Sequence, residues 1–178
     1  MEVRINDTYE EMSAAAAEFV IRQLRHKPAS VMGLAAGGTP CLLYQLLGES
    51  FAAGEVDFSR VRTFSLDEYI GLGADHPQSY RYFMEKRLFS RVNLPGAHIA
   101  APDGMAADIA AECVRYGAAI EAAGGIDLMI LGIGSNAHIG FNEPGPCFVP
   151  DTHVVELSEA TRAANARFFE EPEDTPHW

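Results

Sequence analysis

Residues 126–144 read IDLMILGIGSNAHIGFNEP, and this stretch decides the fold that the sequence predicts. Its first six residues form a short apolar run, which is typical of a buried strand. A glycine-bounded polar loop that carries His138 and Glu143 follows the run directly. Parallel strands in α/β sheets deliver such loops to the carboxyl edge of the sheet, where ligands bind. The stretch therefore predicts a parallel sheet with functional side chains at one edge.

Strand and helix patterns alternate along the rest of the chain. A second apolar run, residues 31–35, ends in residues 37–40 (GGTP), where proline suits the first position of a helix. A third run, residues 61–66, ends in Asp67 and Glu68. Further strands are predicted at residues 2–5, 98–100 and 153–157, and helices from Asn6 or Asp7 to Lys27, after Pro40, from Ser79 to Leu88, at 109–120 and at 161–169. The alternation predicts a three-layer, Rossmann-like α/β fold, with a mostly parallel sheet and helices on both faces.

Composition restricts the class of protein. The length of 178 residues suits one domain, since domains typically hold roughly 100–200 residues. The formal net charge of −12 disfavours nucleic acid and anionic membranes as partners. Three cysteines without paired spacing, no leader pattern and no membrane-length apolar run predict a reduced, cytoplasmic protein. The acidic, proline-broken residues 170–178 predict a loop or a frayed tail.

The glycine loop has two interpretations. Gly37 and Gly38 would let the backbone approach an anion closely, and the helix that follows would offer unpaired N–H groups. A tight turn between strand and helix, with no ligand, explains so short a motif equally well. Arg162 and Arg167 are ordinary surface arginines or ligands of an anion at the same sheet edge.

The polar loops also have two interpretations. Asp67 and Glu68 are either a solvated acidic pair or a partly desolvated one. Burial would raise the pKa of a carboxyl group there and suit the carboxylate to accept a proton from carbon. His138 is either a loop histidine or an acid/base group that Glu143 orients and keeps protonated. Histidine, aspartate and cysteine are too sparse elsewhere to predict a metal site. Together, the loops predict proton transfer on a small phosphorylated metabolite.

Several motifs in the same order resemble the glucosamine-6-phosphate deaminase family, within a wider group that includes 6-phosphogluconolactonase. They are residues 37–40 (GGTP), 64–69 (FSLDEY), 76–80 (HPQSY), 132–144 and 161–169 (TRAANARFF). The resemblance implies an enzyme that converts glucosamine 6-phosphate and water into fructose 6-phosphate and ammonium. It implies a sugar phosphate as substrate and no redox cofactor.

The resemblance also implies residue roles. His138 would assist opening of the sugar ring with support from Glu143, while Asp67 would move a proton from C2 to C1 through an enolamine. Four residues would hold the phosphate: Gly37, Gly38, Thr39 and Arg167.

The chain departs from the family pattern beside the histidine. Asn136 stands where many members have aspartate. It can orient the imidazole of His138 by hydrogen bonding, but it cannot stabilise the positive charge of the protonated ring. Ring opening is therefore expected to be affected more than proton transfer at C2. Ala137 replaces the usual glycine and restricts the loop if this position needs a positive φ. His153 and Val155 replace basic residues of allosteric members, so activation by N-acetylglucosamine phosphate is not expected.

The family pattern also continues beyond this chain, with more sheet, more helix and a lysine that contacts phosphate. We therefore expect a C-terminally shortened single domain whose exposed sheet edge favours self-association into a homo-oligomer. Two alternative functions stay open at this point. One is a 6-phosphogluconolactonase-like hydrolase, and the other is a non-catalytic sugar-phosphate sensor that needs neither Asp67 nor His138.

Overall fold

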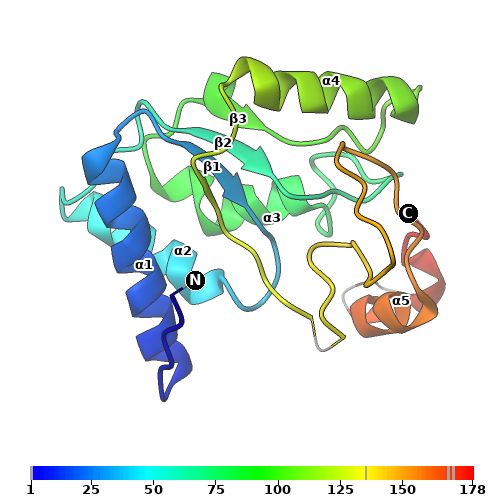
Figure 1. Ribbon diagram of the computed structural model, residues 1–178, viewed down its shortest axis with the longest axis horizontal. Coiled ribbons are helices and arrows are strands. Elements are labelled where there is room, and N and C mark those ends of the chain that lie inside the picture. Colours follow the sequence, from blue (N-terminus) through cyan, green and yellow to red (C-terminus); the bar gives the residue numbers. More distant parts are fainter. Residues whose placement is uncertain (1, 135, 168, 170) are drawn as a thin grey trace.

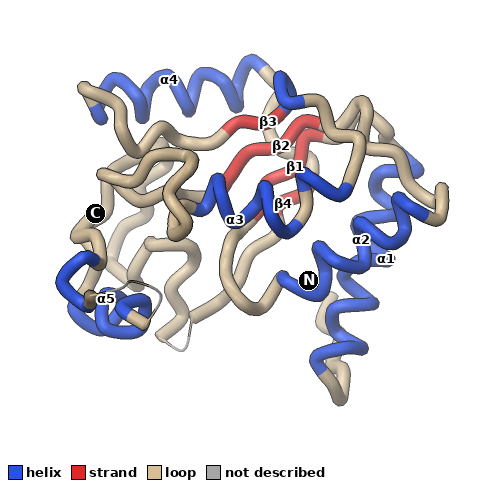
Figure 2. Tube along the Cα trace, turned by 180° about the vertical axis from the view of Figure 1, so that it is seen from behind, coloured by secondary structure: helices blue, strands red, loops and turns tan. Residues whose placement is uncertain are grey.

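The middle layer of the fold is a parallel sheet with strand order β3-β2-β1-β4 (Figures 1 and 2). The computed structural model describes residues 2–134, 136–167, 169 and 171–178. The strands are β1 (Val31–Leu34), β2 (Arg62–Ser65), β3 (Ile99–Ala100) and β4 (Leu128–Met129). Met32 at the centre of the sheet lies opposite Thr63 on β2 and Leu128 on β4. The predicted three-layer α/β fold with parallel strands is confirmed.

Four of the described α-helices follow a residue whose side chain caps them, whereas the helix after Pro40 has no side-chain cap. They are α1 (Tyr9–His26), α2 (Cys41–Ala52), α3 (Tyr80–Arg87), α4 (Ile109–Ala122) and α5 (Glu159–Ala166), with 3₁₀ turns η1 (Phe89–Arg91), η2 (Gly96–His98) and η3 (Pro172–Asp174). Thr8, Ser79, Asp108 and Ser158 each accept a hydrogen bond from a backbone N–H in the first turn of the helix that follows, which satisfies an otherwise unpaired donor. Thr8, and neither Asn6 nor Asp7, therefore caps α1.

Alternation along the strands sends side chains into two separate helical layers. Met32 and Leu34 on β1 pack into the larger core cluster, which α1, α2 and α3 cover. Val31 and Phe64 point to the other face, where Tyr116 of α4 meets the Phe64 ring edge-on at 5.8 Å between centroids. Figures 1 and 2 show α4 on one side of the sheet and α1 with α2 on the other.

Three of the predicted strands differ from the structure. Residues 2–5 and 153–157 are not strands, and the Ile5 side chain is 91% exposed. The long apolar run contributes only Leu128–Met129 to the sheet, where these residues pair with Met32 and Gly33 of β1. An apolar segment becomes a strand only where a neighbouring strand satisfies its backbone groups. Sequence pattern alone does not supply that neighbour.

The last part of the chain folds back onto the rest. Helix α5 begins two residues before the predicted start and ends at Ala166, while Phe168 lies outside the described residues. Backbone N–H groups of Leu157 and Ile70 donate to the carbonyl oxygens of His177 and Trp178 at 2.8 and 3.1 Å. Thr175 is buried. These contacts anchor the end of the chain, which forms a loop with one 3₁₀ turn, so of the two predictions for this segment the loop is confirmed and the frayed tail is not.

Candidate active site

Asp67 follows β2 at the carboxyl edge of the sheet, as the sequence predicts. Its carboxylate accepts no hydrogen bond from the described residues, and burial together with the nearby negative charge of Glu68 raises the pKa of Asp67 to about 7. Both causes disfavour the ionised form. Asp67 is therefore a carboxylate that can take up and release a proton near neutral pH.

Glu68 has a different environment from its neighbour. Its carboxylate accepts hydrogen bonds from the backbone N–H groups of Tyr69, Tyr80 and Arg81, each at 2.9 Å. Two of these donors belong to the first turn of α3, where the helix dipole favours negative charge. Burial nevertheless raises the pKa of Glu68, and the three hydrogen bonds oppose that rise. Glu68 fixes the end of β2 to α3 and so holds the Asp67 backbone in place.

The loop that carries His138 passes over Asp67. A Cβ atom added to Gly140 would lie 3.2 Å from Oδ2 of Asp67 and 3.0 Å from Cδ2 of Leu66, and Gly140 has a φ of +59°. Glycine therefore suits this position because of both the close approach and the backbone conformation. The structure thus brings together two segments that the sequence predicted to meet at one edge.

His138 lies folded within its own loop. Its imidazole occupies the space that a side chain at Gly134 would need, and its Nδ1 is buried without a hydrogen-bond partner among the described residues. Asn136 does not contact the imidazole by a hydrogen bond; instead its Oδ1 accepts from the backbone N–H of His138 at 3.2 Å. The expectation that Asn136 orients the ring directly is wrong, because the amide holds the backbone of His138.

Glu143 is held by three donors from two parts of the chain, the histidine loop and the start of α5. Its Oε1 accepts from the hydroxyls of Thr161 and Ser158 at 2.8 and 3.1 Å, and its Oε2 accepts from Nδ2 of Asn136 at 2.6 Å. The Thr161 hydroxyl, more than the other groups, lowers the pKa of Glu143, and the charge of His138 lowers it further. Glu143 is therefore an ionised group that ties the histidine loop to the start of α5.

Ala137 has a φ of +69°, the one positive value among the described non-glycine residues. The sequence predicted a restricted loop if this position needs a positive φ, and the structure confirms that it does. An L-residue in this region costs roughly 1–2 kcal/mol relative to ordinary backbone. The loop between Asn136 and His138 therefore carries local strain.

The glycine loop lies between β1 and α2, with Gly37 at a φ of +118°. The Tyr9 hydroxyl of α1 donates to the carbonyl oxygen of Thr39 at 2.9 Å and accepts from the N–H of Leu42 at 3.2 Å. The buried Tyr44 hydroxyl donates to the carbonyl oxygen of Ala35 at 2.6 Å. Two tyrosines thus hold the loop at both ends and leave Gly37, Gly38 and Thr39 exposed.

The two candidate arginines have different surroundings. Nη2 of Arg162 donates to the carbonyl oxygen of Thr175 at 3.3 Å, so this side chain supports the packed tail. Arg167 lies exposed at the end of α5, the helix whose first turn holds Glu143. The structure therefore favours Arg167 over Arg162 as a residue that an external anion can reach.

The sequence did not predict the aromatic cluster that lies beside Asp67. Tyr69, Tyr80 and Phe141 have ring centroids 5.0 to 5.7 Å apart, and the Phe169 ring lies 6.0 Å from that of Tyr69. Burial and the charge of Asp67 both raise the pKa of Tyr80. The sequence did not predict the Ser158 and Thr161 contacts to Glu143 either, although serine is a favoured N-cap residue. The cluster joins the Asp67 segment, α3 and the histidine loop.

Neither a metal-binding cluster nor a membrane-spanning helix is found in the part of the chain that the structure describes. No group of three or more histidine, cysteine, aspartate or glutamate side chains there is arranged to hold a metal ion. None of the described helices combines the length and the apolar character that crossing a membrane requires.

Comparison with known proteins identifies relatives of high similarity. A glucosamine-6-phosphate deaminase of Thermoanaerobacter sp. (strain X514) is 53% identical over 176 residues, which cover 99% of this chain and 70% of that protein. A deaminase of the same name from Halothermothrix orenii is 52% identical, with 99% and 73% covered. A solved monomeric glucosamine-6-phosphate deaminase superposes with a TM-score of 0.96 at 42% identity, covering 99% of this chain and 73% of that one.

A more distant solved structure is the 6-phosphogluconolactonase of Thermotoga maritima. It superposes with a TM-score of 0.65 at 26% identity, over 76% of this chain and 61% of that one. Residues 6–141 match the family model described as glucosamine-6-phosphate isomerases/6-phosphogluconolactonase. The similarity in sequence and in structure shows that the chain belongs to this family.

Proposed function

We propose that the protein is a glucosamine-6-phosphate deaminase, which converts glucosamine 6-phosphate and water into fructose 6-phosphate and ammonium. The observation that carries the proposal is the position of Asp67, a carboxylate with a pKa raised to about 7 directly beneath the loop of His138. The identity above 50% to deaminases supports the same substrate.

Asp67 acts as the base on the open-chain sugar. Its ionised carboxylate removes the proton from C2, and the electron pair of that C–H bond forms the C1=C2 double bond of an enolamine. The C1 carbonyl oxygen takes a proton from the substrate's own ammonium group and becomes a hydroxyl. Asp67 returns its proton to C1, which leaves a protonated imine at C2. Water adds to the imine carbon and ammonium leaves, giving the ketone. A positioned base of this kind typically contributes ~10²–10⁴ in rate.

His138 assists the earlier opening of the ring, in which a proton moves from the C1 hydroxyl to the ring oxygen. Glu143 supports it through charge, since the two groups attract each other without a direct hydrogen bond among the described contacts. Asn136 contributes through position alone, because it joins the His138 backbone to Glu143. Ring opening is therefore the step most sensitive to this part of the site.

The phosphate of the substrate binds at the glycine loop and at Arg167. Gly37, Gly38 and Thr39 are exposed there, and no side chain of the first two obstructs an approaching anion. Arg167 adds a guanidinium, which matches phosphate oxygens in pairs. The net charge of −12 gives the substrate no general attraction, so these local donors supply its binding.

A coupled assay of ammonium release from glucosamine 6-phosphate tests the proposal. The unmodified protein is expected to release ammonium, and Asp67→Asn is expected to abolish release while substrate still binds. Asp7→Asn, an exposed carboxylate before α1, is the matched control and should retain full activity.

Three other outcomes would contradict the proposal. Substrate binding without turnover in the unmodified protein would favour a sugar-phosphate sensor. Hydrolysis of 6-phosphogluconolactone without ammonium release would favour a lactonase. Full ammonium release by Asp67→Asn would exclude Asp67 as the base.

A further inference from the structure

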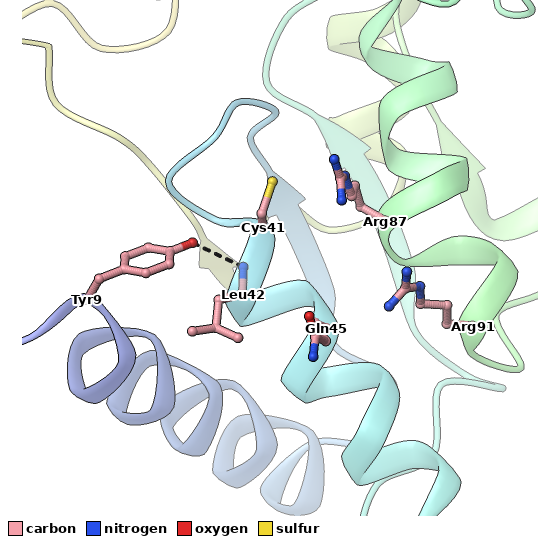
Figure 3. A pocket seen from close by; sticks show the side chains of 6 residues that line it. All are labelled: Tyr9, Cys41, Leu42, Gln45, Arg87 and Arg91. Carbon is pink, nitrogen blue, oxygen red and sulfur yellow. Dashed lines mark hydrogen bonds between the residues drawn. The ribbon is translucent and has the colours of Figure 1, made fainter.

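A cavity of about 210 Å³ lies on the helical layer formed by α1, α2 and α3, beside the glycine loop (Figure 3). It is lined by Tyr9, Cys41, Leu42, Gln45, Arg87 and Arg91. Tyr9 begins α1, the next three residues belong to the first turns of α2, and the arginines end α3 and η1. None of these side chains takes part in the proposed proton transfers, although Tyr9 holds the glycine loop.

The two arginines give the cavity a local positive charge. Figure 3 shows both guanidinium groups on the same side, extending toward α2. Neither forms an ion pair with a carboxylate of the described residues, although five other cations there do. The Arg87 guanidinium lies 5.7 Å from the centroid of the Phe83 ring, and Arg91 packs on Gly48 of α2. Two cations that line the same cavity repel each other, and an anion between them would remove that repulsion.

The other polar groups of the cavity wall are already engaged. The Tyr9 hydroxyl both donates to Thr39 and accepts from Leu42, and the Cys41 thiol donates to the carbonyl oxygen of Gly37 at 3.4 Å. Gln45 donates to the Glu49 carboxylate at 2.9 Å, which is the nearest acidic group joined to the wall by a hydrogen bond. What the cavity offers a ligand is therefore mainly the N–H groups of two guanidinium ions, which favour an acceptor-rich anion.

Size narrows the class of anion. Pockets for drug-sized ligands hold roughly 300–1,000 Å³, and this cavity of about 210 Å³ is smaller. A nucleotide is too large, whereas inorganic phosphate or a short phosphate ester fits. Guanidinium groups match phosphate oxygens in bidentate geometry. We propose that Arg87 and Arg91 form a second anion site, which binds a small phosphate-bearing metabolite separately from the sugar phosphate of the proposed reaction.

The test uses inorganic phosphate as the probe and the side-chain Nε–H signals of the arginines in a ¹H–¹⁵N spectrum as the readout. Phosphate is expected to shift the signals of Arg87 and Arg91 with saturation. Arg87→Gln and Arg91→Gln should each weaken that binding roughly tenfold or more, because each removes charge-assisted hydrogen bonds. In the double variant, which lacks both arginine signals, the backbone N–H signals of Cys41 and Leu42 in the cavity wall are the readout, and phosphate should no longer shift them.

Arg22→Gln is the matched control. Its guanidinium also lies over an aromatic ring, 5.5 Å from the centroid of Phe19, forms no ion pair among the described residues and lies outside the cavity. This variant should bind phosphate like the unmodified protein. Signals of Arg87 and Arg91 that do not respond, or a double variant that binds phosphate as tightly as Arg22→Gln, would overturn the second site.

The second site and the proposed function are tested by separate measurements, so one proposal can be overturned without the other. Arg167→Gln should leave the phosphate response of Arg87 and Arg91 unchanged, because Arg167 belongs to the other site. A protein that shows this response but releases no ammonium retains the second site and loses only the proposed function.

Discussion

At the scale of single residues, the site depends on backbone positions as much as on acid and base groups. Gly140 admits the Asp67 carboxylate, Gly134 admits the His138 ring, and Ala137 accepts a positive φ that glycine would adopt without strain. Each of these positions sets where a neighbouring side chain lies. Of these three positions, Ala137 is the one where a substitution, to glycine, would relieve backbone strain.

Ala137→Gly is expected to raise the free energy of unfolding by about 1 kcal/mol. Glycine removes the cost of the left-handed backbone conformation, and the greater entropy that it gives the unfolded chain offsets part of this stabilisation. Urea unfolding measures the change. Ala118→Gly, at an exposed position within α4, is the control and should lower stability by about 0.8–1.0 kcal/mol. Destabilisation by Ala137→Gly would show that the loop gains from the restriction.

At the scale of elements, helix starts organise the site. Helix α3 binds the Glu68 carboxylate through backbone N–H groups of its first turn, and α5 binds Glu143 through the Ser158 and Thr161 hydroxyls. Both contacts join a helix to a loop at the carboxyl edge of the sheet. The helices therefore position the acid and base groups.

Glu68→Gln is expected to shift the acid limb of the pH dependence of kcat/KM to lower pH. The substitution removes the negative charge that helps to raise the pKa of Asp67, so the base stays ionised at lower pH. The pH profile of ammonium release measures the shift. Glu85→Gln is the control, because Glu85 lies on α3 and pairs with Arg81, and it should leave the limb in place. An unchanged limb in Glu68→Gln would mean that burial alone raises the pKa of Asp67.

Thr161→Val is expected to lower kcat/KM about tenfold, because Glu143 loses a charge-assisted hydrogen bond of 2.8 Å. Thr161→Ser keeps a hydroxyl and should restore most of the rate. Steady-state kinetics with both variants, beside thermal unfolding, separates a catalytic effect from a loss of helix stability. Equal rates for valine and serine would argue against a role for this contact.

At the scale of the whole molecule, the site carries a stability cost. Asp67 has a pKa near 4 in an unfolded chain and about 7 in the folded protein. Between these values the folded state binds a proton that the unfolded state has released, so stability falls as pH rises from about 4 to 7. Above pH 7 the full cost remains of ionising a half-buried carboxylate that accepts no hydrogen bond from the described residues.

Asp67→Asn is therefore expected to stabilise the protein at pH 8, by up to about 4 kcal/mol, since one pKa unit corresponds to about 1.4 kcal/mol. The advantage should shrink as pH falls and vanish near pH 4. Denaturant unfolding at several pH values measures it, with Asp7→Asn as the control. An advantage that does not depend on pH would contradict the raised pKa.

The sequence alone determined the elements whose signals are local. Apolar runs and caps predicted β1, β2, β3 and the helices from α1 to α4, and the strand ends predicted Asp67 and the histidine loop at one edge. Only the tertiary structure decided that residues 2–5 and 153–157 are not strands, that Asn136 holds the His138 backbone, and that Glu68 and Glu143 bind helix starts. The physical reason is that these outcomes depend on partners distant in the chain, because backbone and side-chain polar groups must be satisfied wherever folding brings a donor and an acceptor together.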